Sequence, residues 1–168
     1  MGLTPETRGG AAGSLRRRPH VRVCALVVRG DTTLLVRQSK GDATYWLLPG
    51  GALELGETME EAVRREIREE CSLDVTLLGP LGVVESISPD RGRSRHVVHF
   101  VYAASVDGDA HALAGDRAIL EVRWVTADEA RSLVLHPPIA DLVVEWIGGL
   151  AAGGPLPPFV AAGPRWVP

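Results

Sequence analysis

Apolar residues recur in two different periods along the chain, and each period predicts a different kind of element. Residues 21–28 and 34–37 are apolar or β-branched and are separated by Gly30-Asp31, so they predict two antiparallel strands joined by a turn. Residues 45–48 form a third short apolar run. The Pro49-Gly50-Gly51 sequence after it predicts a strand that enters a loop.

The period changes to that of a helix after Gly56. Thr58 followed by Glu61 matches a capping box, in which each side chain bonds the backbone N–H of the other residue. Five apolar residues then fall on one stripe at helical spacing: Met59, Ala62, Val63, Ile67 and Cys71. We therefore expect one helix over residues 58–71, with this stripe facing the core.

The rest of the chain mixes strands and helices without strict alternation. Residues 73–87 contain two apolar runs, and Gly79-Pro80 is expected to break the chain between them. Residues 88–94 are typical of a loop. Further elements are predicted as strands over 97–104 and 119–125, a short capped helix from Thr126, and a last helix over 138–147. This order favours an α+β or layered sandwich fold over a doubly wound sheet.

The length of 168 residues suits one domain with a sizeable core. We expect a domain over residues 19–150, a mobile tail over 1–18 that is rich in Gly, Ala, Ser and Arg, and a Pro/Gly-rich tail over 151–168.

Composition and charge narrow the function classes. The net charge is −3, whereas a general nucleic-acid binder is expected to be basic, so a nucleic-acid polymer is a poor candidate partner. No run approaches the roughly 18 apolar residues that span a bilayer, and residues 1–20 lack the apolar stretch of a signal peptide. Cys24 and Cys71 are typical of small buried residues in a reducing compartment such as the cytoplasm, with a disulfide as the alternative.

Four glutamates gather around the predicted helix 58–71. Glu66 lies one turn from both Glu69 and Glu70, so the three carboxylates can converge, and Glu57 can reach them from the loop before the helix. Like charges at this spacing oppose a helix by roughly 0.2–0.5 kcal/mol per pair, and a cation between them reverses that sign. Mg²⁺ prefers such carboxylate and carbonyl oxygens, and the unhindered Gly50 carbonyl is a further candidate ligand.

The alternative is a solvated helix face held by pairs such as Arg65 with Glu69. If the glutamates bind metal instead, neutralising Glu69 or Glu70 should lower turnover far more than folding stability, because the charges repel one another without metal.

The whole set of spacings resembles the signature of the Nudix family: Gly, five residues, Glu, seven residues, Arg-Glu, an aliphatic residue, any residue, Glu-Glu, any residue, Gly, and an aliphatic residue. The matching positions are Gly51, Glu57, Arg65, Glu66, Ile67, Glu69, Glu70 and Leu73. The departure is Ser72, which stands where the family has glycine. That position follows the helix end, where left-handed backbone is common, so serine would cost on the order of 1 kcal/mol.

The resemblance implies an α/β/α sandwich with a mixed sheet, and cleavage of a nucleoside diphosphate linked to another moiety, with ADP-ribose-like compounds favoured. It implies Glu66, Glu69 and Glu70 as ligands of Mg²⁺, with Mn²⁺ as a substitute, and Glu66 as a group that activates water. Glu57 becomes a supporting acid, and Arg65 orients the carboxylates. A homodimer is compatible with this reading.

Residues outside the signature are candidates for substrate contacts. A further loop acid is often recruited in such enzymes, and Asp116, Glu121 and Asp90 are the candidates, each with an exposed loop acid as its alternative. Trp46, Tyr45 or Phe100 could stack on a base or belong to the core. Arg91, Arg93 and Arg95 suit phosphate contacts or a solvated loop.

Three details bear on the choice of substrate and function. Pro89, sixteen residues after Leu73, resembles a mark of ADP-ribose-cleaving members, although a loop proline needs no such reason. His96 and His99 should point to opposite faces of a strand and have structural roles. Two alternatives to ADP-ribose cleavage are hydrolysis of modified nucleoside triphosphates and a catalytically silent nucleotide sensor, which should have lost one of its metal-binding glutamates.

Overall fold

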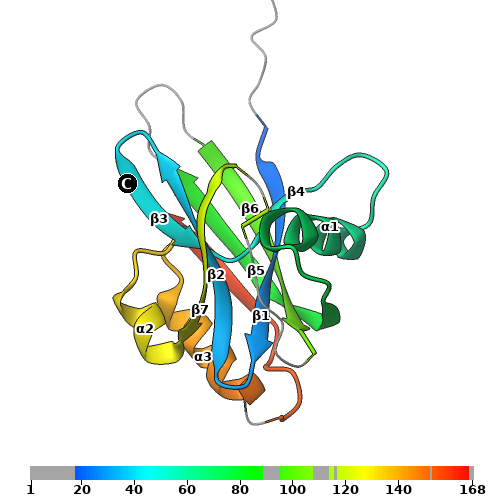
Figure 1. The fold of residues 1–168 in the computed structure, drawn as a ribbon. Coiled ribbons are helices and arrows are strands. Elements are labelled where there is room, and N and C mark those ends of the chain that lie inside the picture. Colours follow the sequence, from blue (N-terminus) through cyan, green and yellow to red (C-terminus); the bar gives the residue numbers. More distant parts are fainter. Residues whose placement is uncertain (1–17, 89–94, 108–113, 116, 152, 167–168) are drawn as a thin grey trace, which may run out of the picture.

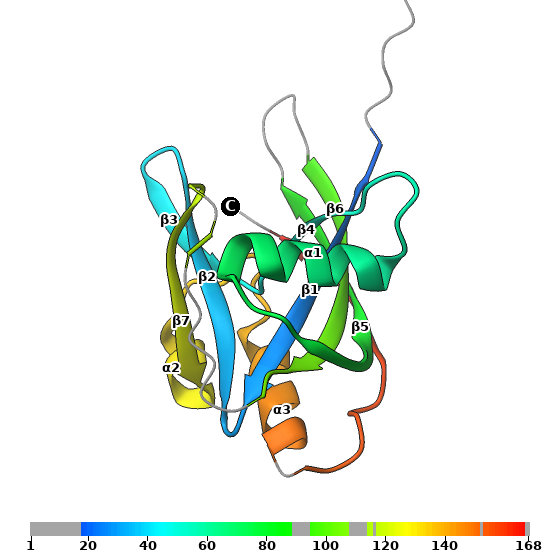
Figure 2. The same cartoon turned by 45° about the vertical axis from the view of Figure 1, so that its right-hand side comes forward.

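One mixed sheet forms the middle layer of the protein. The computed structural model describes residues 18–88, 95–107, 114–115, 117–151 and 153–166. Within them, α1 covers one face of the sheet, and α2 and α3 cover the other (Figure 1, Figure 2). The predicted α/β/α sandwich is therefore confirmed. The elements are β1 (His20–Arg29), β2 (Thr32–Lys40), β3 (Ala43–Leu47), β4 (Gly50–Ala52), α1 (Met59–Cys71), β5 (Thr76–Ser88), β6 (Arg95–Ser105), β7 (Ile119–Thr126), α2 (Ala127–Ser132), α3 (Ala140–Ala151) and β8 (Val160–Trp166).

The first two strands form the predicted antiparallel hairpin and then diverge. Gly30 takes a positive φ of 59° at the turn, and β1 and β2 pair only near it, with Val28 opposite Thr33. Farther along, β1 pairs with β4 and runs parallel to β6, whereas β2 pairs with β3 and β7. The sheet therefore splits into two halves that open away from the hairpin turn, and the candidate functional site lies at this opening.

Helix α1 forms where the sequence predicts it. Thr58 is its N-cap, and both bonds of the capping box with Glu61 are present. Val63 and Ile67 are fully buried, and Met59 packs against the same cluster, so the apolar stripe faces the core as expected. Full burial of side chains of this size contributes about 1.5–3 kcal/mol each. This packing turns the opposite, acidic face of the helix toward the sheet opening and solvent.

Strand β1 supplies both cores because successive side chains point to opposite faces. Val23, Ala25 and Val27 pack under α1, whereas Cys24 and Leu26 pack under α3. Both cysteines are buried and free, as the sequence predicts in preference to a disulfide. Burial raises the pKa of Cys24 to about 11 and that of Cys71 to about 12, so neither thiol is reactive at neutral pH.

Two segments differ from the sequence expectation. Gly79-Pro80 does not break the chain into two runs: β5 continues through it, and the register against β6 shifts on either side of Pro80 instead.

The C-terminal stretch predicted as a tail contains β8, which pairs in parallel with β5. A side chain at Gly82 would overlap the Val160 carbonyl, so this glycine lets the two strands approach. The sequence of β8 lacks the alternation that would reveal a strand. Residues 1–17, predicted as a tail, lie outside the described residues.

None of the three described helices is long and apolar enough to cross a membrane.

Ser72 adopts the left-handed backbone that its place after α1 predicts, with φ 55° and ψ 35°. It is exposed, so a smaller residue leaves no cavity. The Ser72→Gly variant is expected to raise the free energy of unfolding by about 0.5–1 kcal/mol, because glycine has no Cβ to resist this conformation. Urea unfolding of both proteins measures the difference. An equal or lower stability of the variant would show that Ser72 is not strained.

Candidate active site

Arg65 lies at the centre of three carboxylates. Its Nη2 and Nε donate to the two oxygens of Glu57 at 2.8 and 3.1 Å, and its Nη1 donates to Glu66 Oε1 at 2.8 Å. The same Nη1 lies 3.4 Å from Glu69 Oε2, and Nη2 also donates to the Ala52 carbonyl at 3.2 Å. The bidentate pair with Glu57 ties the loop before α1 to the helix. Arg65 therefore holds Glu66 in a defined position.

The contacts between Arg65 and Glu57 shift the pKa of each group. The hydrogen bonds from Arg65, followed by the bond from the Glu54 N–H, lower the pKa of Glu57, and the bond to Glu57 raises the pKa of Arg65. Both groups therefore stay charged over the whole physiological range.

Glu70 sits apart from this group and is buried, with 6% of its surface exposed. Its Oε2 accepts from the Gly50 N–H at 2.8 Å, and its Oε1 accepts from Gln38 Nε2 at 3.3 Å. The Gly50 contact joins the end of α1 to β4 on the floor of the opening. Neutralising Glu70 would disturb both hydrogen bonds, so the expectation of unchanged stability on neutralisation applies to Glu69 and not to Glu70.

Gly51 leaves the space in which the Glu66 carboxylate lies. A Cβ built at Gly51 would overlap all three atoms of that carboxyl group. The first and the fourth residue of the matched signature are thus in direct contact. The signature spacing has a steric reason here: glycine on β4 admits a carboxylate from α1.

The carboxylate oxygens of this cluster are ligands of the kind that a hard divalent cation prefers. Arg65 pairs with the carboxylates of Glu57, Glu66 and Glu69, and Glu70 adds a fourth carboxylate on the same helix, so negative charge exceeds positive charge in this cluster. Oxygen ligands of this kind are those that Mg²⁺ takes. Among the described residues, no three acidic, histidine or cysteine side chains already converge on one point. The residues therefore offer an open, incomplete site that substrate oxygens would complete, with the Gly50 carbonyl as a further predicted ligand.

A cleft opens beside this cluster, between the two halves of the sheet. It is open to solvent and has a volume of about 130 Å³. Gln38 links the cleft to the acidic cluster, because it lines the cleft and donates to Glu70. The lining residues are Arg22, Gln38, Tyr45, Leu47, Ser86, Ser88, Arg95, Val97, His99, His136 and Pro137.

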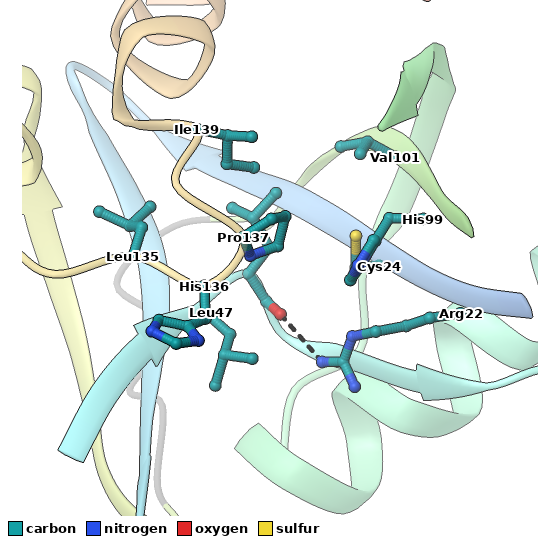
Figure 3. Close-up of a pocket in the computed structure, with 10 residues that line it drawn as sticks. Arg22, Cys24, Leu47, His99, Val101, Leu135, His136, Pro137 and Ile139 are labelled. Carbon is teal, nitrogen blue, oxygen red and sulfur yellow. Dashed lines mark hydrogen bonds between the residues drawn. The ribbon is translucent and has the colours of Figure 1, made fainter. Parts of the chain in front are cut away.

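The walls of the cleft come from elements far apart in the sequence. A smaller pocket beside it shares Arg22, His99 and Pro137 with the cleft; in Figure 3, Arg22 and His99 lie opposite the segment that carries Pro137. The Arg22 guanidinium donates to the Leu48 carbonyl at 3.3 Å. On the other wall the rings of Tyr45 and His136 stack with centroids 4.4 Å apart.

The structure distributes the predicted substrate residues unevenly. Trp46 is buried in the core, 8% exposed, with the Arg123 guanidinium 4.7 Å from its ring centre, which favours the packing role over stacking on a base. Glu121 on β7 forms an ion pair with Arg37 on β2 at 2.9 Å. Phe100 packs against the core under α1. Arg95 and Tyr45 line the cleft. Pro89, Asp90, Arg91, Arg93 and Asp116 lie outside the described residues.

Several cleft residues were missed by reasoning from the sequence. Arg22, Gln38, Ser86 and His136 belong to four different segments, and no local spacing connects them. The available signal is weak: Arg22 and Gln38 are polar positions that lie two residues from the buried Cys24 and Val36 on the same faces of their strands.

His96 and His99 point to opposite faces of β6, as predicted. His96 bonds Glu85 at 2.7 Å, and His99 bonds Ser86 Oγ at 2.9 Å inside the cleft wall. Burial, and then the positive charges of Arg22 and Arg95, lower the pKa of His99 to about 3. His99 is therefore neutral in the folded protein at any physiological pH.

This shift predicts a dependence of stability on pH. Below the unfolded-state pKa of about 6.5, His99 gains a proton only in the unfolded chain, so the free energy of unfolding falls as the pH is lowered from about 6.5 toward 3. The loss attributable to His99 approaches about 1.4 kcal/mol per pH unit. Urea unfolding between pH 7 and 4.5 should show a shallower slope for His99→Gln than for the wild type. The matched His96→Gln variant retains His99 and should keep the steep slope. Parallel slopes for wild type and His99→Gln would contradict the assignment.

Comparison with known proteins identifies the family of this chain. A family model described as the NUDIX domain matches residues 18–147. The chain therefore belongs to the Nudix hydrolase family. Its sequence is 39% identical over 101 residues to an ADP-ribose pyrophosphatase of Methanocaldococcus jannaschii, a match that covers 60% of this chain and 58% of that relative. It is 27% identical to a nucleoside triphosphatase NudI of an Enterobacter species, over 71% of this chain and 90% of the relative.

A solved structure supports the same fold. A NUDIX hydrolase from Nitrosomonas europaea superposes with a TM-score of 0.68 at 25% identity, covering 84% of this chain and 94% of the other. The chain spans little more than half the length of the ADP-ribose pyrophosphatase that it resembles.

Proposed function

We propose that this protein hydrolyses the pyrophosphate bond of a nucleoside diphosphate linked to another moiety, with ADP-ribose-like compounds as preferred substrates and Mg²⁺, or Mn²⁺ in its place, as cofactor. The observation that carries this proposal is the contact between Gln38 and Glu70, which joins the acidic end of α1 to the solvent-open cleft. The similarity to an ADP-ribose pyrophosphatase supports the choice of substrate.

In this proposal, the glutamates and the arginine around α1 have different roles. Glu66, Glu69 and Glu70 hold the cation, and Glu66 takes the proton of the attacking water. Arg65 keeps Glu66 in position, and Glu57 in turn keeps Arg65 charged and oriented. When bound, Mg²⁺ neutralises charge on the pyrophosphate oxygens and lowers the pKa of a bound water. The cleft beside Gln38 receives the part of the substrate beyond the pyrophosphate.

A substrate panel with Mg²⁺ and product analysis tests the proposal. ADP-ribose should yield AMP and ribose 5-phosphate. The second candidate, a nucleoside triphosphate pyrophosphohydrolase, is favoured by the similarity to the nucleoside triphosphatase NudI and would yield a monophosphate and pyrophosphate. Binding without turnover of any compound would instead support the silent sensor, which the presence of Glu66, Glu69 and Glu70 disfavours. The two free cysteines support action in a reducing compartment such as the cytoplasm.

Metal and substrate are expected to tighten each other's binding. The free protein should bind Mg²⁺ weakly, because no closed set of ligands exists among the described residues and the cation would keep most of its water. Substrate oxygens then complete the site, and linkage makes the effect reciprocal. Calorimetric titration of Mg²⁺ with and without a non-hydrolysable ADP-ribose analogue measures this coupling. Equal Mg²⁺ affinities in the two titrations would show that the carboxylates do not meet the substrate's phosphates. Their catalytic assignment would then be wrong.

A further inference from the structure

The lining of the cleft is basic, although acidic residues lie beside it. Gln38 lines the cleft and donates to Glu70 on α1. The lining also holds Arg22 from β1 and Arg95 from β6, and none of the described residues that line the cleft is acidic. A pyrophosphate bridged by cations would lie at the glutamates of α1, and the two arginines lack a role in that chemistry.

Arg22 is half-buried and incompletely partnered for a charged group. A guanidinium has five N–H donors, and the Leu48 carbonyl accepts one of them at 3.3 Å. Within the described part of the chain, neither Arg22 nor Arg95 forms an ion pair with a carboxylate. Removing a cation from water without an opposite charge is unfavourable, so this wall of the cleft favours an anion.

Neutral donors complete the same wall. His99 is 7% exposed, lines the cleft and is hydrogen-bonded to the Ser86 hydroxyl; Ser86 and Ser88 also line the cleft. Because the pKa of His99 is lowered to about 3, it adds no third positive charge and instead offers a neutral ring nitrogen. Two guanidinium groups with nearby hydroxyls are the donor set that suits a tetrahedral oxyanion.

We propose that the basic lining of the cleft, formed by Arg22, Arg95, His99 and Ser86, binds a phosphate group separate from the pyrophosphate at the glutamates of α1. The edge of a neutral base could accept hydrogen bonds from these groups, but it would leave both positive charges uncompensated. The phosphate is either a second phosphoryl group of the nucleotide, remote from the cleaved bond, or free phosphate. Its assignment to the substrate rests on the function proposed above, whereas the binding itself does not.

NMR titration of the ¹⁵N-labelled protein with inorganic phosphate tests the site directly. The titration is done in EDTA without divalent cation, at constant ionic strength with chloride as the balancing anion. Saturable shifts are expected at Arg22, Ser86 and His99, and Arg22→Gln should weaken binding at least about fivefold. Arg95→Gln should also weaken it, and this exposed residue can be changed without disturbing the core. No turnover is measured, so failure of the proposed hydrolysis would leave this test intact.

Arg29→Gln is the matched control, because Arg29 is another half-buried arginine of β1 and lies over the Trp124 ring, outside the cleft lining. It removes the same charge and should leave phosphate affinity unchanged. Absence of saturable shifts, or equal affinity in wild type and both cleft variants, would overturn the proposal.

Adenosine 3′,5′-bisphosphate and AMP distinguish the two sources of the phosphate. A preference for the bisphosphate that Arg22→Gln abolishes would assign the group to the nucleotide. Equal nucleotide affinities, with free phosphate still binding beside AMP, would assign the site to free phosphate.

Discussion

The Glu69→Gln variant is expected to lose at least about 100-fold in kcat while its melting temperature stays within about 2 °C of the wild type. Loss of a residue that merely supports a metal ligand typically costs 10–100-fold, and Glu69 is proposed as a ligand itself. Its side chain is 58% exposed and makes one long contact, 3.4 Å to Arg65, so the fold depends little on its charge. Steady-state kinetics at saturating Mg²⁺ and a thermal melt without metal measure the two effects.

Glu60→Gln is the control for this result. Glu60 lies on the same helix, is 62% exposed and has a comparable pair with Arg64 at 3.7 Å, but it faces away from the acidic cluster around Arg65. Its kcat should stay within about twofold of the wild type. Equal losses of activity in the two variants, or a parallel loss of stability and activity in Glu69→Gln, would favour a solvated helix face over a metal site.

The Gly51→Ala variant is expected to lose activity to a similar degree without unfolding. The new Cβ would overlap the Glu66 carboxyl group, which is the far end of a flexible side chain and can swing aside. The backbone at Gly51 does not have a positive φ, so alanine is tolerated there. We expect a fall in kcat of about 100-fold or more, and a free energy of unfolding within about 1 kcal/mol of the wild type. Kinetics and urea unfolding on the same preparation separate the two quantities.

Gly50→Ala provides the contrast, because it changes the neighbouring glycine by the same methyl group. Gly50 has φ 146°, and its Cβ would meet the Val23 carbonyl and lie 2.5 Å from the Cys24 Cα. These backbone atoms cannot move aside, so this variant should lose about 3 kcal/mol or more of stability. If Gly51→Ala lost as much stability as Gly50→Ala, the specific contact between Gly51 and Glu66 would not explain the loss of activity.

The sequence alone determined the features that depend on neighbours along the chain. The capping box at Thr58 and the stripe through Val63 and Ile67 predicted α1, because a helix is specified by contacts three and four residues apart. The same spacing predicted which glutamates share a face. The Gly30 turn predicted the β1–β2 hairpin for the same reason: its hydrogen bonds close locally.

The tertiary structure decided how these local pieces are used. Glu69 and Glu70 are adjacent in sequence, yet Glu70 is buried because α1 docks on β4 and on Gln38, and Glu69 remains exposed. Nothing in the glutamate spacing distinguishes them. The difference arises because Glu70 faces Gly50 and Gln38, whereas Glu69 faces solvent.

The cleft likewise exists only in three dimensions. Arg22 and His99 become neighbours because β1 and β6 pair in parallel, with Arg22 opposite His99, although 76 residues separate them in sequence. His136 reaches Tyr45 because its segment bonds to Trp46 through backbone groups, which carry no sequence signal. Strand β8 was missed for the same reason, since its parallel pairing with β5 is specified by a long-range fit at Gly82. Side-chain patterns report local periods and burial, whereas pairing between distant strands is decided by the packing of the whole sheet.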